Sequence, residues 1–216
     1  MIRPIRSHDV LLADIRASDK RDGNFRLWWL GQSGFLLQWQ GVHVLLDPYL
    51  SDSLTKKYSQ TDKPHVRMTE LVIDPAQLSF VDVVTSSHNH TDHLDAETLV
   101  PILAGNPRPK LVIAESNRAF VADRLSIDPT VPIGVDDGTV VEVSGIRFSG
   151  WLPPTKPLSA TSRVAPGFSA TCCSLENGWF TTAATRSGTR TWRKSSSPSE
   201  CASHCSPSMA ARLKEG

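Results

Sequence analysis

The sequence predicts a layered, mixed α/β domain, and three observations lead to that class. Near the start, three short runs rich in β-branched and aromatic residues are separated by glycine-containing turns, the pattern of antiparallel hairpins. Farther along, strand-like and helix-like segments alternate, which places helices against a sheet. The 216 residues carry a net charge of +1 and contain no run of 18 apolar residues, so we expect one globular domain without a spanning helix.

Local patterns predict the elements one by one. Strands are expected at 25–30, 35–39, 42–46, 80–85, 111–114, 140–143 and 146–148, and helices at 10–17, 96–103 and 117–125. Pro48 ends the third strand because proline cannot donate to a ladder, and Ser116 is the expected cap of the last helix. The polar stretch 51–70 is expected to be a functional or mobile loop.

Residues 151–216 differ in composition from the rest of the chain. They hold 8 Ile, Leu, Val, Phe and Met in 66 positions and no aspartate, and their charge is +5 against −4 for residues 1–150. The tail also contains all four cysteines: Cys172, Cys173, Cys201 and Cys205. Their spacing lacks the pairs of a zinc ribbon, and without a secretory signal a disulfide framework is not expected. We therefore divide the chain into an N-terminal segment (1–24), a body (25–150) and an anomalous tail (151–216).

Histidine and aspartate cluster directly after the strand expected at 80–85. The chain reads His88, Asn89, His90, Thr91, Asp92, His93. In an extended segment residues two apart point the same way, so His88 and His90 can converge on one cation. Asp92 and His93 can face a second cation as the chain turns toward the next helix. Imidazole and carboxylate suit Zn, Mn or Fe, and sites gather at the carboxyl ends of strands. The alternative is a solvated loop that happens to be rich in histidine.

The other histidines show no such pattern. His8 and His43 are expected at the surface or at a strand edge, and His204 lies in the tail. His65, in the polar loop, could reach a substrate, because loops often carry function. No other substrate-binding residue is predicted.

The motif HNHTDH, flanked by LWWLGQSGFLLQWQGVHVLLDPYLSD and VDDGTVVEVSGIRFSG, resembles the metallo-β-lactamase superfamily. The flanking segments resemble the branch of ascorbate-6-phosphate lactonase and related cytoplasmic metal-dependent hydrolases. It spans residues 25–150 and implies the N-terminal half of an αββα sandwich.

The resemblance also implies a ligand set. His88 and His90 would bind a first metal, and Asp92 and His93 a second, so one or two divalent ions are expected, with Zn or Mn favoured. Asp47 would support the site from behind the ligands. From the residues alone, Asp47 could equally serve only the Asp-Pro turn that ends its strand.

The implied chemistry is hydrolysis by a metal-activated hydroxide, with Asp92 and His93 as catalytic residues at the metals. The implied substrate is a lactone or a phosphorylated small molecule, in a cytoplasmic protein. A phosphodiesterase of the same fold and a non-catalytic metal-binding relic are the alternatives. The charge pattern predicts neither a nucleic-acid nor a membrane partner. Self-association is expected through a sheet face left exposed by a missing second half.

The tail lacks what the resemblance leads us to expect there. Family members continue with a second αβ half that supplies a third histidine, a bridging aspartate and a final histidine. Shifting the codon boundaries by one base permits a histidine within Trp151–Lys156 and an aspartate within Trp179–Arg186, in family order. We hypothesise the loss of one base near codon 150, an impaired chain and little stable structure beyond it. A natural, disordered Ser/Thr-rich extension is the alternative.

Overall fold

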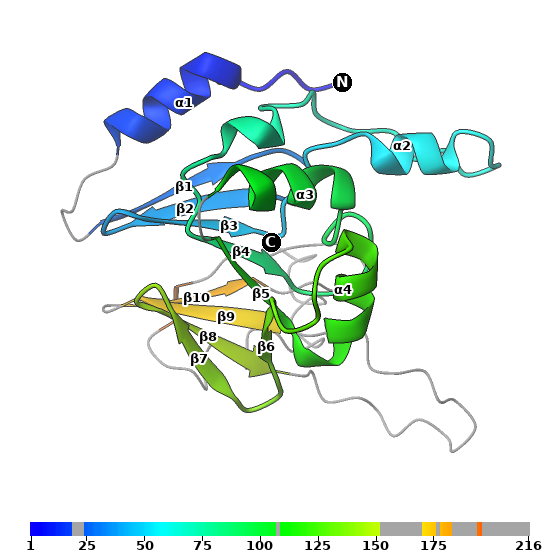
Figure 1. Ribbon diagram of the computed structural model, residues 1–216. Helices are drawn as coiled ribbons and strands as arrows, with labels where there is room; N and C mark the ends of the chain where they lie inside the picture. The colour runs from blue at the N-terminus through cyan, green and yellow to red at the C-terminus, as the bar shows by residue number, and fades with distance from the viewer. Residues whose placement is uncertain (19–23, 107–108, 152–169, 176–177, 183–193, 196–216) are drawn as a thin grey trace, which may run out of the picture.

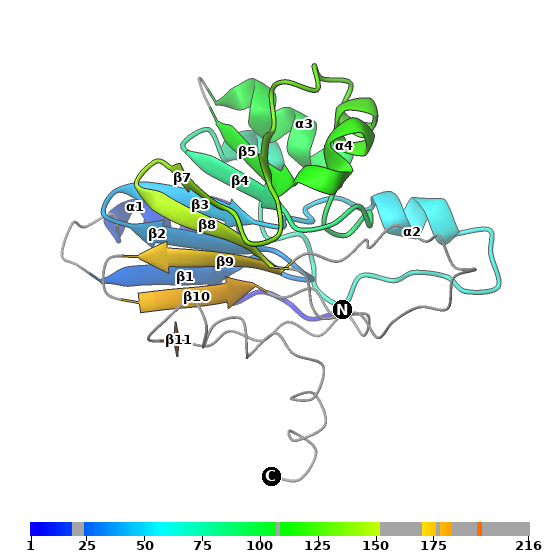
Figure 2. The ribbon, with the colours of Figure 1, turned by 90° about the horizontal axis from the view of Figure 1, so that it is seen from below.

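Two β-sheets stack face to face, and helices cover the outer side of the first sheet (Figure 1). The structure is a computed structural model that describes residues 1–18, 24–106, 109–151, 170–175, 178–182 and 194–195. The strand order is β1-β2-β3-β4-β5-β6 in the first sheet and β11-β10-β9-β8-β7 in the second. In the view from below, strands of the second sheet lie in front of those of the first (Figure 2).

The first sheet begins as antiparallel hairpins and continues as parallel strands. Its strands are β1 (Phe25–Trp29), β2 (Phe35–Trp39), β3 (Val42–Leu46), β4 (Val83–Ser86), β5 (Lys110–Ala114) and β6 (Ile133–Val135). Gln40 and Gly41 both have positive φ, which suits the tight turn between β2 and β3. From β3 to β6 all pairs are parallel, so their carboxyl ends lie at one edge of the sheet.

Three of the described helices pack on one face of this sheet: α1 (His8–Ala17), α3 (Ala96–Gly105) and α4 (Arg118–Leu125). A fourth helix, α2 (Ser53–Tyr58), projects from the molecule (Figure 1), and the short 3-10 turns are η1 (Pro75–Gln77) and η2 (Glu115–Asn117). Helix α1 buries Leu11, Leu12 and Ile15 in the same core as α3 and α4, so the N-terminal segment packs with the body. No helix within the described ranges is long and apolar enough to cross a bilayer.

Alternate residues of the central strands supply two separate cores. Leu36, Leu45 and Val84 face the helices, whereas their neighbours Leu37, Leu46 and Val83 face the second sheet. Both faces of these strands are therefore apolar, as expected for strands buried on two sides. From the second sheet, Val143, Ile146 and Phe148 complete the core between the sheets.

The second sheet extends into the tail. Its strands are β7 (Val140–Val143), β8 (Ile146–Trp151), β9 (Ala170–Leu175), β10 (Gly178–Thr182) and β11 (Lys194–Ser195). The expectation of little structure beyond residue 150 is wrong for these last three strands. Strand β9 pairs with β8, β10 with β9 and β11 with β10. Such pairing satisfies backbone groups whatever the side chains are, so a poverty of apolar residues does not forbid it. The remainder of the tail lies outside the described residues.

The layers match the predicted mixed α/β class, whereas the restriction to the N-terminal half of a sandwich stays a prediction. No described helix covers the outer face of the second sheet, so the order is helices, sheet, sheet. The apolar inner face of the first sheet is covered from β2 to β6, and its exposed apolar side chains are Phe25, Leu27 and Trp29 of β1. Self-association through an exposed sheet face stays a prediction.

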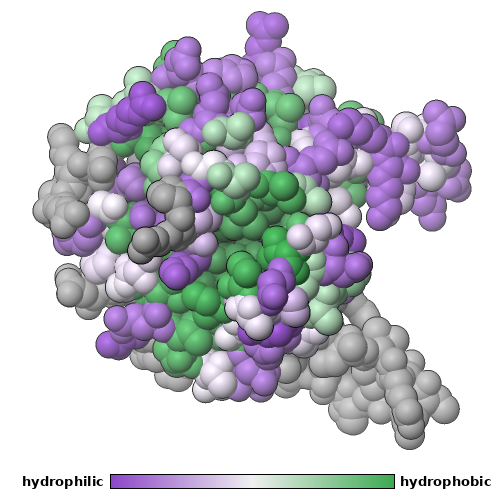
Figure 3. Space-filling model, in the orientation of Figure 1, coloured by the Kyte–Doolittle hydropathy of each residue, from purple (hydrophilic) through white to green (hydrophobic). Residues whose placement is uncertain are grey.

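Most predicted elements are confirmed, with differences at their ends. The strand expected from residue 80 begins at Val83, and the residue that caps α4 is Asn117 rather than Ser116, which lies inside the 3-10 turn η2. The sequence missed helix α2 within the loop 51–70 and the short strand β6. Helix α2 and the residues after it form a hydrophilic arm (Figure 3).

Candidate metal centre

The HNHTDH segment leaves the carboxyl end of β4, beside the end of β3. Leu46 of β3 pairs with Thr85 of β4, so Asp47 lies next to the first residues after β4. Asp47 has φ +43°, in the left-handed region, which aspartate adopts more readily than most residues. Two neighbouring parallel strands therefore deliver Asp47 and the motif to one edge of the sheet.

A tight turn gathers three of the predicted ligands. The backbone N–H groups of His93 and Leu94 both donate to the carbonyl of His90, at 3.0 and 2.8 Å. This turn brings ligand atoms of His88, Asp92 and His93 within 4.8 Å of one another. The ring centroids of His88 and His93 lie 3.9 Å apart. Three donors at such spacing can hold one metal ion.

His90 is placed differently from these three. It is exposed, and its ring centroid lies 4.7 Å from that of His88, but it stands outside the group of three. Strand alternation predicts that His88 and His90 point the same way, yet β4 ends at Ser86, before the motif begins. Alternation therefore does not govern this segment. The four-ligand assignment over two metals stays a prediction.

Asp47 lies directly behind His93. Its Oδ2 is 2.8 Å from Nδ1 of His93, and its Oδ1 accepts from the hydroxyl of Thr85 at 3.0 Å and from the N–H of Ser87 at 2.9 Å. The hydroxyl of Ser87 also donates to Asp47 Oδ2. Asp47 is 1% exposed. Asp47 therefore contacts His93 in addition to its place in the Asp-Pro turn, and its supporting role at a metal stays a prediction.

The two nitrogens of His93 face different carboxylates. An ionised carboxylate only accepts hydrogen bonds, so Nδ1 carries a proton toward Asp47, while Nε2 lies 3.2 Å from Oδ2 of Asp92. In a neutral ring Nε2 is an acceptor, so it would face a second acceptor. Two acceptors this close need a positive group between them: either a second proton on His93, carried by Nε2, or a cation bound by both Nε2 and Asp92. The residues present thus fit a divalent metal.

The electrostatics of the site favour the metal-binding forms of two of the three residues, His88 and Asp92. Burial, together with the charge of the nearby His93, lowers the pKa of His88 to about 4, so its imidazole is neutral at pH 7. Burial acts to raise the pKa of Asp92, but the hydrogen bond and charge of His93 outweigh it and bring that pKa to about 2. Neutral imidazole and ionised carboxylate are the forms that bind metals.

Two side chains from outside the motif hold the ligand loop in place. The hydroxyl of Ser33, in the turn between β1 and β2, donates to the carbonyl of Asp92 at 2.6 Å. Arg124 of α4 donates to the carbonyls of Asn89 at 2.9 Å and Leu94 at 3.2 Å. Neither residue was predicted from the sequence, because each contacts backbone carbonyls of a segment distant in the chain, and residue types do not report such contacts.

A cleft of about 440 Å³ opens beside the ligands. Its lining includes His90 and Asp92 on one side and, from α2 and the following loop, Lys57, Lys63 and His65. Arg124 adds a further positive charge to the wall. The cleft therefore brings positive side chains close to the candidate metal centre, and His65 lies where it could reach a substrate.

The remaining histidines divide between the two expectations. His8 is exposed, as predicted. His43 is not at a strand edge: it is 7% exposed on the central strand β3, with its ring edge-on to Phe80 and 3.9 Å from Asp82. The prediction for His43 was wrong because the flanking strands β2 and β4 could not be placed on both sides of β3 from sequence. His204 lies outside the described residues.

Comparison with known proteins gives a family match over this part of the chain. The model of the family described as "Beta-lactamase superfamily domain" matches residues 26–162. An uncharacterized protein of Mycobacterium tuberculosis is 35% identical over 128 residues, which cover 56% of this chain and 34% of that protein.

Two further relatives have names that describe an activity. "Probable L-ascorbate-6-phosphate lactonase UlaG" of Salmonella heidelberg is 25% identical over 159 residues, 62% of this chain and 43% of that protein. The mitochondrial "N-acyl-phosphatidylethanolamine-hydrolyzing phospholipase D" of Saccharomyces cerevisiae is 32% identical over 93 residues, 43% of this chain and 19% of that protein. The chain thus spans less than half the length of these three relatives.

Proposed function

This chain belongs to the metallo-β-lactamase superfamily, and on that premise we propose that it is a metal-dependent hydrolase of a lactone or a phosphorylated small molecule. One observation carries the proposal: donor atoms of His88, Asp92 and His93 lie within 4.8 Å of one another at the edge of an open cleft. The lactonase name of the Salmonella relative supports this substrate class.

Each residue of the site has a separate task in this proposal. His88, Asp92 and His93, with His90 beside them, would hold Zn or Mn. Asp47 keeps the proton of His93 on Nδ1, so that Nε2 presents its lone pair on the other side of the ring. When bound, such an ion lowers the pKa of water and stabilises negative charge on an attacked carbonyl or phosphoryl oxygen.

The cleft supports an anionic substrate. Lys57, Lys63 and Arg124 contribute positive charge to its lining, and charge of one sign in a cleft raises the local concentration of oppositely charged molecules. A phosphate or carboxylate on the substrate would therefore be drawn to the wall that faces the ligands.

Two alternatives have their own support. The phospholipase name of the yeast relative favours a phosphodiesterase of the same fold. The limited set of donors favours a non-catalytic metal-binding protein, because the described residues bring together three ligands rather than a complete two-metal set.

We further propose that the body, residues 25–150, is the N-terminal half of the enzyme and that the tail is read out of frame. The poverty of apolar residues and the absence of aspartate in the tail support this. The coding DNA tests it: codons that forbid histidine at the shifted Trp151–Lys156 or aspartate at the shifted Trp179–Arg186 would refute the frameshift.

The activity is tested on the purified full chain, loaded with Zn²⁺ or Mn²⁺, with a phosphorylated lactone and a phosphodiester as separate substrates. Because the second half of the enzyme is proposed to be out of frame, we expect impaired lactone hydrolysis, which is lost in His88→Ala and kept in His8→Ala, an exposed histidine outside the site. Diester hydrolysis with the same dependence would favour the phosphodiesterase. Bound metal without any turnover would favour the non-catalytic reading, and a chain that binds no metal would overturn the proposal.

A further inference from the structure

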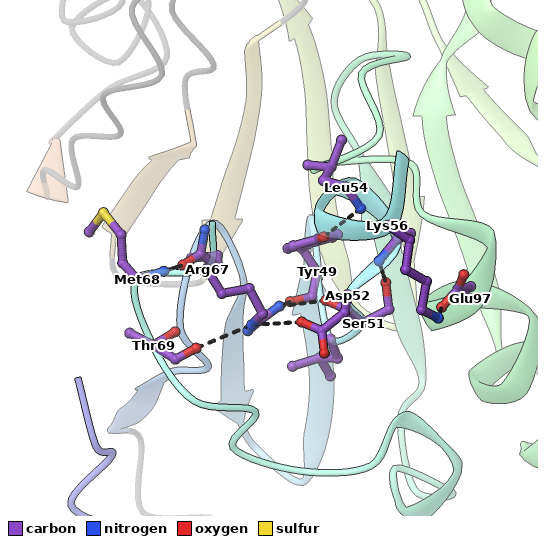
Figure 4. Close-up of polar contacts among 12 residues, drawn as sticks. Tyr49, Ser51, Asp52, Leu54, Lys56, Arg67, Met68, Thr69 and Glu97 are labelled. Atoms are coloured by element: carbon purple, nitrogen blue, oxygen red, sulfur yellow. Dashed lines mark hydrogen bonds and ion pairs between the residues drawn. The ribbon is translucent and has the colours of Figure 1, made fainter. Parts of the chain in front are cut away.

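Arg67 is a buried cation that the proposed reaction does not use. It lies at the end of the loop after α2, and its side chain is 2% exposed. Figure 4 shows it reaching between Thr69 and the segment that follows β3. Burial lowers the pKa of its guanidinium, which reflects the cost of removing this charge from water.

The guanidinium of Arg67 binds backbone carbonyls rather than a close carboxylate. Nη1 donates to the carbonyls of Ser51 at 2.7 Å and Tyr49 at 3.3 Å, and Nε donates to that of Thr69 at 3.2 Å. The nearest ion pair, to Asp52, is long at 3.7 Å. Among the described residues, Nη2 has no hydrogen-bond partner. A buried charge held this way is a weak source of stability, and its hydrogen bonds constrain the backbone of the segment that follows β3.

One path leads from Arg67 to His93 through the chain after β3. Arg67 fixes the carbonyls of Tyr49 and Ser51, and the guanidinium lies 5.1 Å from the ring of Tyr49. Two residues before Tyr49 is Asp47, which has a left-handed backbone and orients His93. A backbone conformation of this kind persists only where its surroundings hold it.

A second path leads from Arg67 to Asp92 through the turn between β1 and β2. A Cβ on Gly31 would lie 2.4 Å from the hydroxyl oxygen of Thr69, so this turn packs directly on the Arg67 segment. Gln32 Oε1 also accepts from the N–H of Met68 at 2.7 Å. Ser33 of the same turn donates to the carbonyl of Asp92.

We propose that Arg67 is a positioning residue for the candidate metal centre, which it holds in shape through Asp47 on one side and through the Gly31–Gly34 turn on the other. It also anchors the loop that carries Lys63 and His65 into the cleft. This inference rests on one part of the proposed function, that these residues bind a metal. It does not require that the chain hydrolyse a substrate.

The test compares Arg67→Met with Arg118→Met in the full chain. Arg118 is the control, because it also donates to two backbone carbonyls, those of Pro129 at 2.7 Å and Pro132 at 2.8 Å, and is not part of the metal centre; unlike Arg67 it is partly exposed and pairs with Glu115 at 2.7 Å. Zn²⁺ affinity is measured by competition with a chelator, the Co²⁺ absorption spectrum reports ligand geometry, and urea denaturation reports stability.

We expect Arg67→Met to weaken Zn²⁺ binding by about tenfold, the low end for residues that orient ligands, and to alter the Co²⁺ spectrum. Arg118→Met should lose stability without either change. Equal effects of the two variants on Zn²⁺ affinity, or none from Arg67→Met, would overturn the inference.

A second variant, Arg67→Lys, keeps the positive charge and most of the aliphatic part of the side chain. It provides the test if Arg67→Met does not fold. One ammonium cannot reproduce the fixed fork that serves three carbonyls, so weakened Zn²⁺ binding is expected here too. Full affinity in this variant would contradict the inference. A native chain that binds Zn²⁺ but hydrolyses nothing would overturn the hydrolase proposal alone, whereas a native chain without Zn²⁺ affinity would overturn both.

Discussion

Oδ2 of Asp47 lies 2.8 Å from Nδ1 of His93, although the two residues are 46 positions apart in the chain. This contact fixes which nitrogen of His93 is available to a metal. It joins the end of β3 to the ligand loop after β4, and both residues are buried.

Asp47→Asn should weaken Zn²⁺ binding by about 10- to 100-fold, because the amide is a poorer acceptor for the Nδ1 proton of His93. Asparagine tolerates the left-handed backbone, so the fold should persist. A competition titration measures the affinity. Asp82→Asn is the control, since Asp82 lies beside another buried histidine, His43, on the same sheet. Equal losses in both variants would contradict a specific role for Asp47.

The metal-free chain should lose stability as the pH falls from about 6.5 to about 4. The pKa of His88 is about 4 in the folded state against an ordinary 6.5, so in this window the unfolded chain binds the proton more readily. Above pH 6.5 this contribution does not change. Urea denaturation across the window should show a shallower pH dependence in His88→Gln than in the native chain, with His8→Gln unchanged. The same slope in all three proteins would refute the assignment.

Lys63→Glu should raise KM for an anionic substrate and leave kcat largely unchanged, because Lys63 lines the cleft and is not a predicted ligand. The effect should shrink at high salt, which screens exposed charges. Lys110→Glu, an exposed lysine at the opposite end of the parallel strands, is the control. An identical KM change in the control would show a general charge effect instead of a substrate contact.

Gly31→Ala should be markedly more destabilising than Gly145→Ala. Both glycines have positive φ, at +81° and +76°, and for each the left-handed backbone alone costs alanine about 1–2 kcal/mol. Only at Gly31 would the new Cβ also meet Thr69, at 2.4 Å, whereas nothing lies within 4 Å at Gly145. The free energies of unfolding from urea denaturation decide this, and equal values would show that the turn does not pack on Thr69 as described.

Local sequence patterns predicted most helices and strands, but not which of them lie side by side in the fold. The hairpins around Gln40–Gly41 and Ser144–Gly145 follow from turn residues between β-rich runs, and the structure has both. The buried place of His43 depends on strands β2 and β4 on either side, which periodicity within β3 does not report. Helix α2 lacks the apolar spacing that would have identified it, because only Leu54 is buried.

In the candidate site, too, residues that are close in sequence could be predicted, whereas contacts between distant segments could not. The cluster His88, Asp92 and His93 could be predicted because its members lie within six residues. Arg67 and Arg124 could not, because each acts through backbone carbonyls of segments distant in sequence, and such contacts leave no trace in residue types. The strands β9 and β10 were missed because the tail is poor in apolar residues, and apolar patterns are what identify strands in a sequence. Their backbone pairing does not depend on such a pattern.

The most direct test of the account is the Zn²⁺ stoichiometry and affinity of the purified chain, measured beside His88→Ala and His8→Ala. We predict that the native chain and His8→Ala bind at least one ion tightly and that His88→Ala loses this binding. A native chain that binds no Zn²⁺, or a His88→Ala variant that binds it as tightly as the native chain, would contradict a metal centre at these residues.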